Sequence, residues 1–299
     1  MSTGLLTENW EILMAQHRLY SVTSIGRPLD PRYQTNRAVQ RLMPIAAVVA
    51  AAIEGGGGGD AKAIALAAVG GLLVMFGCWA LARELVPDDN PAAFISMGLA
   101  FGSFVLLHDA SLLLPFVTLF LVRIVNRSTG LKAKMGDSVL VLLLSLSAIY
   151  HLHSPLLGLV AALAFAFDAL LEDGLPRQWV FAGVSAAAAG FALALDPLAG
   201  IRLLELTPTL LASVAILSAL WLSNIALTRS VASVADVGEQ PLSAARVRMG
   251  MLVGWLVALQ VLTATDSGAY SGALVWATLA GLIVGRVAAA MRLDDPSPS

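Results

Sequence analysis

Residues 110–152 read ASLLLPFVTLFLVRIVNRSTGLKAKMGDSVLVLLLSLSAIYHL, which is two apolar segments joined by a short basic connection. The connection and its edges carry four cations, which are Arg123, Arg127, Lys132 and Lys134. Cationic side chains resist translocation, so a basic connection between two apolar segments stays on the cytoplasmic side of a membrane. The stretch therefore predicts two transmembrane helices joined on the cytoplasmic side.

The composition of the whole chain agrees with a membrane protein. Of its 299 residues, 58% are hydrophobic and only 13% are charged, whereas a soluble domain carries roughly 25% charged residues. Most of the surface is therefore expected to face a lipid bilayer. The formal net charge of −2 argues against a nucleic-acid partner, which would require a basic face. Nothing in the composition identifies a cofactor or a protein partner.

Apolar segments of suitable length recur along the chain. A spanning helix needs about 20 apolar residues, and ten candidates are present: 42–54, 61–82, 91–107, 110–126, 137–152, 154–171, 178–195, 208–227, 247–264 and 269–290. The first is the weakest, and residues 91–126 could form one hairpin or a partly re-entrant pair, which leaves a range of eight to ten spans. We expect an all-α polytopic membrane protein with about ten transmembrane helices arranged as hairpins.

The distribution of cations predicts the orientation. If the N-terminus is cytoplasmic and ten segments span, sixteen of the eighteen Lys and Arg residues fall on the cytoplasmic side. Only Lys62 and Arg202 fall outside. Such sorting follows the positive-inside rule. It predicts a multi-pass protein of the bacterial inner membrane with both termini in the cytoplasm.

The two ends of the chain are expected to differ from the transmembrane domain at 42–290. In residues 1–41, apolar and aromatic side chains recur at helical spacing, namely Leu6, Trp10, Leu13, Met14, His17 and Tyr20. This pattern predicts an amphipathic helix in the cytoplasmic tail that lies at the membrane interface or on the protein itself. Residues 291–299 end in Pro-Ser-Pro-Ser and are expected to be disordered.

Polar residues recur at the predicted outer ends of the segments. His108 and Asp109 close one segment, His151 and His153 another, and Asp196 a third. Asp109 precedes His153 by 44 residues, and His153 precedes Asp196 by 43. The similar turns suggest a helical-hairpin repeat and predict that these side chains share an outward-facing cavity. The alternative is that these positions are ordinary polar turns, in which Asp109, Ser154 and Pro155 only cap the next helix.

Chemical roles can be assigned to these outer residues as hypotheses. Asp109, with His108, would be the catalytic base or metal-binding carboxylate. The side chains expected to bind substrate are His151, His153, Asp196 and Arg202. No cysteine or third clustered histidine completes a usual ligand set, so no metal site is assigned.

Asp168 is the one acidic residue well inside a predicted span, toward its inner end. Ionisable residues within spans usually face the bundle interior and take part in function. Asp168 is therefore the candidate coupling carboxylate of a transporter. The alternative is that it snorkels to the interface near Glu172 and Asp173.

Residues 80–166 have a recognisable pattern, which begins ALARELVPDDNPAAFISMGLAFGSFVLLHDASLLLPFVTLFLVRIVNRS. A charged inner loop, an apolar helix, an outer turn with Asp109 and a leucine-rich helix ending in arginines follow one another. This order resembles membrane glycosyltransferases of the GT-C class. The resemblance implies a lipid-linked or amphipathic substrate handled at the outer face. The chain departs from that class in its first outer loop, which is only Glu54, five glycines and Asp60.

Two other functions fit the same topology. Ten spans in about 300 residues with both ends inside resemble a small secondary transporter of the drug/metabolite type, in which five plus five helices form two inverted halves. The near absence of charge in the centres of the spans also suits a non-catalytic assembly subunit. The sequence leaves these alternatives open.

Reporter fusions test the predicted topology. Fusions after residues 58 and 198 are expected to report the outer side, and fusions after residues 130 and 240 the cytoplasmic side. If the fusions at 130 and 198 report the same side, the number of spans between them is wrong.

Overall fold

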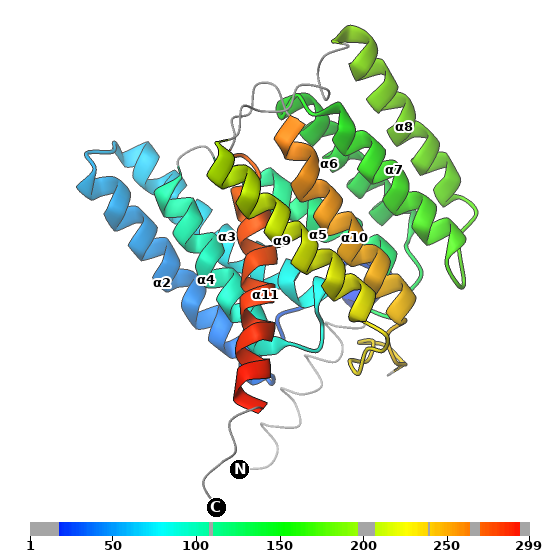
Figure 1. Ribbon diagram of the computed structural model, residues 1–299, viewed down its shortest axis with the longest axis horizontal. Helices are drawn as coiled ribbons and strands as arrows, with labels where there is room; N and C mark the ends of the chain where they lie inside the picture. The colour runs from blue at the N-terminus through cyan, green and yellow to red at the C-terminus, as the bar shows by residue number, and fades with distance from the viewer. Residues whose placement is uncertain (1–17, 108–109, 197–206, 239, 264–269, 294–299) are drawn as a thin grey trace, which may run out of the picture.

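The computed structural model describes residues 18–107, 110–196, 207–238, 240–263 and 270–293. Apart from one bridge between Val234 and Pro241, this part of the chain is built from helices and their connections (Figure 1). Its α-helices are α2 (Gln34–Gly56), α3 (Ala61–Leu85), α4 (Asn90–Leu106), α5 (Leu113–Asn126), α6 (Met135–His151), α7 (Pro155–Leu170), α8 (Gln178–Leu195), α9 (Pro208–Leu227), α10 (Ala244–Gln260) and α11 (Ala273–Leu293). The 3-10 turn η1 (Val261–Thr263) follows α10.

Six of these helices are long and apolar enough to cross a membrane: α2, α3, α8, α9, α10 together with η1, and α11. The other four, α4 to α7, are apolar but shorter. Many large apolar side chains on the outer helices are exposed, for example Ile216 and Leu227 on α9. Such faces are unfavourable in water but suit contact with lipid. The helices therefore support a multi-pass membrane protein.

Each predicted segment overlaps one helix; most boundaries differ slightly, and the largest difference is at the start of the first segment. We expected the first segment to begin at residue 42, whereas α2 begins at Gln34. The apolar pattern missed the polar first two turns because a helix continues beyond its hydrophobic part wherever backbone hydrogen bonding allows it. The amphipathic helix predicted for the tail lies mostly outside the described residues, which include only a helical turn at 18–22.

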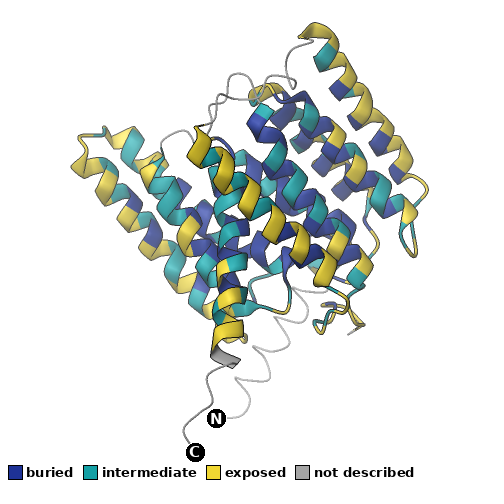
Figure 2. Ribbon diagram, viewed as in Figure 1, coloured by how far each residue is buried: buried dark blue, intermediate teal, exposed yellow. Residues whose placement is uncertain are grey.

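Helix α5 forms the centre of the bundle. Eleven of its 14 residues are buried, and it contacts α3, α6, α7, α10 and α11. The margins are α2 at one end of the molecule and α8 at the other (Figure 1). Figure 2 shows that buried residues concentrate between these margins and that α2, α8 and α9 are exposed along one side.

The closest helix contacts are made by glycines on α10 and α11. A Cβ on Gly281 would lie 2.3 Å from the Cα of Ser96, and one on Gly285 would lie 2.4 Å from the Cβ of Ala92. Gly250 and Gly254 of α10 instead leave room for the side chains of Asn126 and Leu85. The small-xxx-small spacing therefore lets α11 approach the backbone of α4, as small residues do in other membrane bundles, and lets α10 receive side chains from α5 and α3.

Replacing Gly281 by Ala is expected to destabilise the fold by about 1–3 kcal/mol, because the new methyl group meets the backbone of α4, which cannot move aside without repacking. Gly98 on α4 is the matched control, since a Cβ there meets nothing within 4 Å. Unfolding of the two variants in detergent micelles provides the measurement. Equal stability of Gly281→Ala and Gly98→Ala would contradict the close packing of α4 on α11.

Candidate functional site

Three of the predicted outer residues, His151, His153 and Asp196, are described and exposed, and the shared outer cavity stays a prediction. His151 is the last residue of α6 and is exposed, with its ring edge-on to Tyr150. His153 is exposed in the following turn, where its φ of 45° places it in the left-handed region. Asp196 is exposed at the end of α8. None of the three lines either of the cavities described below.

His108, Asp109 and Arg202 lie outside the described residues, so their roles stay predictions. The capping alternative is only partly met in the neighbouring turn. Pro155 begins α7 in its first turn, but the side chain of Ser154 makes no cap. It instead forms a buried hydrogen bond with the side chain of Gln260.

Asp168 is completely buried and does not snorkel to the surface. Its Oδ1 accepts a hydrogen bond from Nε of Arg127 at 2.7 Å and one from Nη1 of Arg246 at 3.0 Å. Its Oδ2 accepts a hydrogen bond from Nε2 of Gln178 at 3.1 Å. These bonds join α7 to α8, α10 and the end of α5. Two arginines therefore compensate the charge of Asp168, and it lines neither described cavity.

Glu84 forms a second buried cluster on the other side of α5. Its Oε1 lies 3.0 Å from Nε of Arg123 and 3.3 Å from Nη1 of Arg27, and it accepts a hydrogen bond from Ser128 at 3.0 Å. Its other oxygen, Oε2, is buried and has no hydrogen-bond partner among the described residues. The cluster connects α3 and α5 to the segment that precedes α2.

That segment, residues 18–33, runs across the ends of the helices. Asp137 on α6 accepts hydrogen bonds from the backbone N–H of Ser24 at 2.6 Å and from the hydroxyl of Thr23 at 2.6 Å. Thr129 donates to the backbone carbonyl of Ser24 at 2.6 Å. The N-terminal segment is therefore held over the connection between α5 and α6.

A further connection, residues 228–243 between α9 and α10, closes the same end of the bundle. Arg27 forms a bidentate pair with Asp236, with nitrogen–oxygen distances of 2.7 and 2.5 Å. Burial alone would lower the pKa of Arg27, but Glu84 and Asp236 outweigh burial and raise this pKa above its ordinary value. Arg27 therefore remains charged and connects three separate parts of the chain.

These parts enclose a cavity of about 630 Å³, which we call the basic cavity. It is bounded by the N-terminal segment, the ends of α3, α4 and α5, and the connection 228–243. Its ionisable lining comprises four arginines and three acids: Arg27, Arg32, Arg83, Arg123, Asp30, Glu84 and Asp236. The described lining therefore carries a formal excess of one positive charge.

Arg83 accounts for this excess because it has no carboxylate partner among the described residues, whereas Arg27, Arg32 and Arg123 all have one. Its guanidinium lies over the ring of Trp79, 5.8 Å from the centroid, and donates to the side-chain oxygen of Asn90. The Nε of Arg83 and the Nε1 of Trp79 are buried without an acceptor in the described structure. Buried donors without acceptors are costly. The site can therefore accept a negatively charged group.

This site was not predicted from the sequence, in which the arginines at this end indicate only the topology. One signal was available. Arg123 lies inside a predicted span, and a charged residue within a span is expected to pair or to function. The partner of Arg123, Glu84, is 39 positions away in the chain, and nothing in the sequence pattern connects the two.

No protein-family model, curated protein or solved structure matches this chain. The resemblance of residues 80–166 to GT-C glycosyltransferases therefore has no independent support.

Replacing Asp168 by Asn is expected to destabilise the protein by about 3–5 kcal/mol, because Arg127 and Arg246 would stay buried beside a neutral amide. Asp173 provides the control. Its carboxylate is largely exposed and lies 3.7 Å from the exposed Lys132, so Asp173→Asn should cost less than about 1 kcal/mol. Unfolding in micelles measures both. Similar stabilities for the two variants would show that the pairs of Asp168 do not hold the bundle together.

Proposed function

We propose that this chain is a multi-pass protein of the bacterial inner membrane, with both termini in the cytoplasm, that binds a small anionic ligand in the basic cavity. The arginine-rich ends of the helices lie together, since Val237 donates a hydrogen bond to the carbonyl of Thr129 at 3.0 Å. The positive-inside rule assigns that end to the cytoplasm. The ligand would therefore enter from the cytoplasmic side.

The observation that carries this proposal is the state of Arg83. A guanidinium presents a planar fork of donors that matches phosphate and carboxylate groups. Here Nη1 is used by Asn90, while Nε has no acceptor. An anion beside Arg83 would accept that hydrogen bond and would also be within the charge field of the cavity. The indole N–H of Trp79 would supply a further donor.

The unpaired Oε2 of Glu84 narrows the class of ligand further. Glu84 lines the same cavity as Arg83, and its buried Oε2 has no donor among the described residues. A ligand with a hydroxyl or amino group next to its anionic group would satisfy both side chains. A phosphate monoester or a hydroxy acid has this character. The volume of about 630 Å³ lies within the range of about 300–1,000 Å³ typical of small-molecule sites.

The more specific functions suggested by the sequence have different support. Outer-face handling of a lipid-linked substrate depends on Asp109, and it remains a separate prediction. A drug/metabolite-type transporter needs two equivalent halves, in which α3–α4 would correspond to α8–α9. Helix α3 packs on α4, whereas α8 does not contact α9 among the described residues. This difference favours a ligand-binding or assembly role over that kind of transporter.

Binding of inorganic pyrophosphate to the purified protein in detergent tests the proposal, with inorganic phosphate as the second probe and ionic strength held constant. Arg83→Gln is expected to weaken affinity about tenfold or more, since a charge-assisted hydrogen bond contributes roughly 1.5–3 kcal/mol. Trp79→Phe retains the ring but removes the N–H, and it should weaken binding by a smaller factor. Titration calorimetry measures both effects.

Arg37 is the matched control because it is an exposed arginine on the first turn of α2. Arg37→Gln should leave the affinity unchanged. Asn90→Ala releases Arg83 from its amide partner but keeps its charge, so it should retain most of the binding. The proposal fails if the wild-type protein binds neither probe at millimolar concentration or if Arg83→Gln binds as tightly as wild type.

A further inference from the structure

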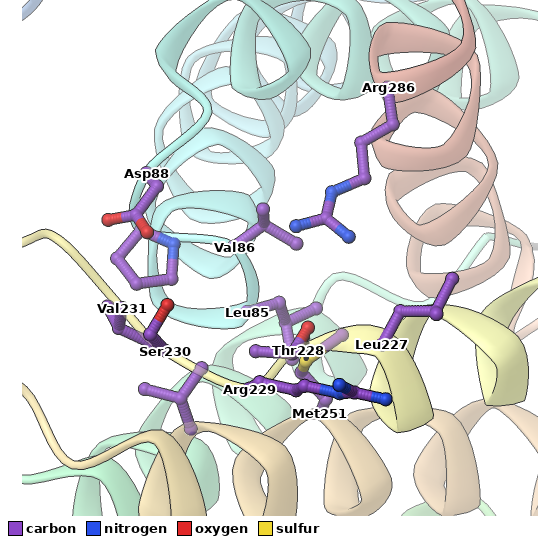
Figure 3. Close-up of a pocket in the computed structure, with 12 residues that line it drawn as sticks. Leu85, Val86, Asp88, Leu227, Thr228, Arg229, Ser230, Val231, Met251 and Arg286 are labelled. Atoms are coloured by element: carbon purple, nitrogen blue, oxygen red, sulfur yellow. Dashed lines mark hydrogen bonds between the residues drawn. The ribbon is translucent and has the colours of Figure 1, made fainter. Parts of the chain in front are cut away.

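A second, smaller cavity of about 150 Å³ lies beside the basic cavity, and Pro87 lines both. It is bounded by the end of α3, the end of α9 and its following residues, α10 and α11. Figure 3 shows Arg286 reaching in from α11 toward Val86, with Thr228 and Arg229 on the opposite wall. We call it the lateral cavity.

The charges of this cavity favour an anion. Arg229 and Arg286 line it and have no carboxylate partner within 4 Å among the described residues. Among the described residues, Arg286 donates only to the side-chain oxygen of Asn224. The single acid in the described lining, Asp88, accepts hydrogen bonds from the backbone N–H groups of Ala232 and Ser233 at 2.9 and 2.7 Å.

Asp88 is thus already engaged. Burial would raise its pKa, but the hydrogen bonds from residues 232 and 233, together with the charge of Arg286, outweigh burial and lower it below the ordinary value. Its carboxylate is therefore ionised at neutral pH and stays bound to the connection after α9. With two arginines and one acid, the described lining of the lateral cavity carries a formal excess of one positive charge.

The surroundings of the lateral cavity favour a lipid as the source of the anion. Helix α9 contains no Asp, Glu, Lys or Arg in its 20 residues, and only 17% of its spanning window is buried, against 61% for α10 with η1. Its exposed face includes Leu220 and Leu227, and the adjoining α11 exposes Val284 and Val287. An apolar face of this length lies along acyl chains. The arginines lie at the end of that face, where lipid phosphates are found.

We propose that the lateral cavity binds the phosphate of an anionic phospholipid, with Arg229 and Arg286 contacting the phosphate and the acyl chains lying along α9 and α11. Basic pockets between transmembrane helices on the cytoplasmic side bind such head groups. The cavity is below the roughly 300 Å³ at which small-molecule sites begin, so it suits one phosphate group rather than a whole soluble metabolite. This site is separate from the ligand site proposed at Arg83.

Lipid-dependent thermal stability tests the proposal. Purified protein in micelles receives phosphatidylglycerol, phosphatidylcholine or inorganic phosphate at equal concentration. The melting temperature should rise more with phosphatidylglycerol than with phosphatidylcholine, and inorganic phosphate should give no comparable rise. The difference between the two lipids should fall at least twofold in Arg229→Gln and disappear in the double variant with Arg286→Gln.

Arg248→Gln is the control, because Arg248 is an exposed arginine near the start of α10 that lines neither cavity. It should keep the full preference for phosphatidylglycerol. Arg229 is exposed and lies beyond the end of α9, so Arg229→Gln reports on binding even if Arg286→Gln impairs folding. An unchanged preference in Arg229→Gln would overturn the proposal, and an equal rise with inorganic phosphate would assign the cavity to a soluble anion.

The two cavities can be separated in the same experiments. Arg83→Gln should keep the preference for phosphatidylglycerol, and Arg229→Gln should keep pyrophosphate affinity. A protein that shows the lipid preference but binds no pyrophosphate would leave this inference standing and refute the proposed ligand site.

Discussion

The bundle depends on carboxylates that compensate the charges of two buried arginines at the end of its central helix, α5. Arg123 and Arg127 lie one turn apart at the end of α5, and each reaches a different acid. Arg127 leaves the helical path at φ 49° and pairs with Asp168 on α7, whereas Arg123 pairs with Glu84 on α3. An unpaired charge in such an environment is very costly. The two pairs therefore determine which helices flank α5.

Apolar packing holds the helices together away from the ion pairs. The pairs lie at one end of the bundle, and away from that end the helices meet through small residues and aliphatic side chains. Glycines on α11 allow α4 to approach closely, and α10 lies against α5 and α7. Helices α2 and α8 at the margins, and α9 on one side of the bundle, have exposed apolar faces. The fold thus combines a polar end, where ion pairs determine which helices pack together, with apolar outer faces that suit contact with lipid.

Much of the helical architecture could be predicted from sequence, because a long apolar run has few stable forms in a membrane other than a helix. The positions of α8 and α9 were predicted to the residue. The start of α2 and the partners of Asp168 could not be predicted. Hydropathy does not show where a helix with a polar first turn begins. An ion pair between residues 41 or 78 positions apart in the chain leaves no periodic signal in the sequence. The basic cavity was missed for the same reason, since it forms only where distant segments meet.

The pair between Arg27 and Asp236 has a consequence for the order in which the protein is made. The two residues are 209 positions apart in the chain. Translation proceeds from the N-terminus, so Arg27 leaves the ribosome long before its partner exists. Until residue 236 emerges, Arg27 lacks this partner, and the wall that residues 228–243 give to the basic cavity is not yet in place. The basic cavity therefore acquires its last wall only after α2 to α9 have been synthesised, so the proposed ligand site is complete only in the nearly finished chain.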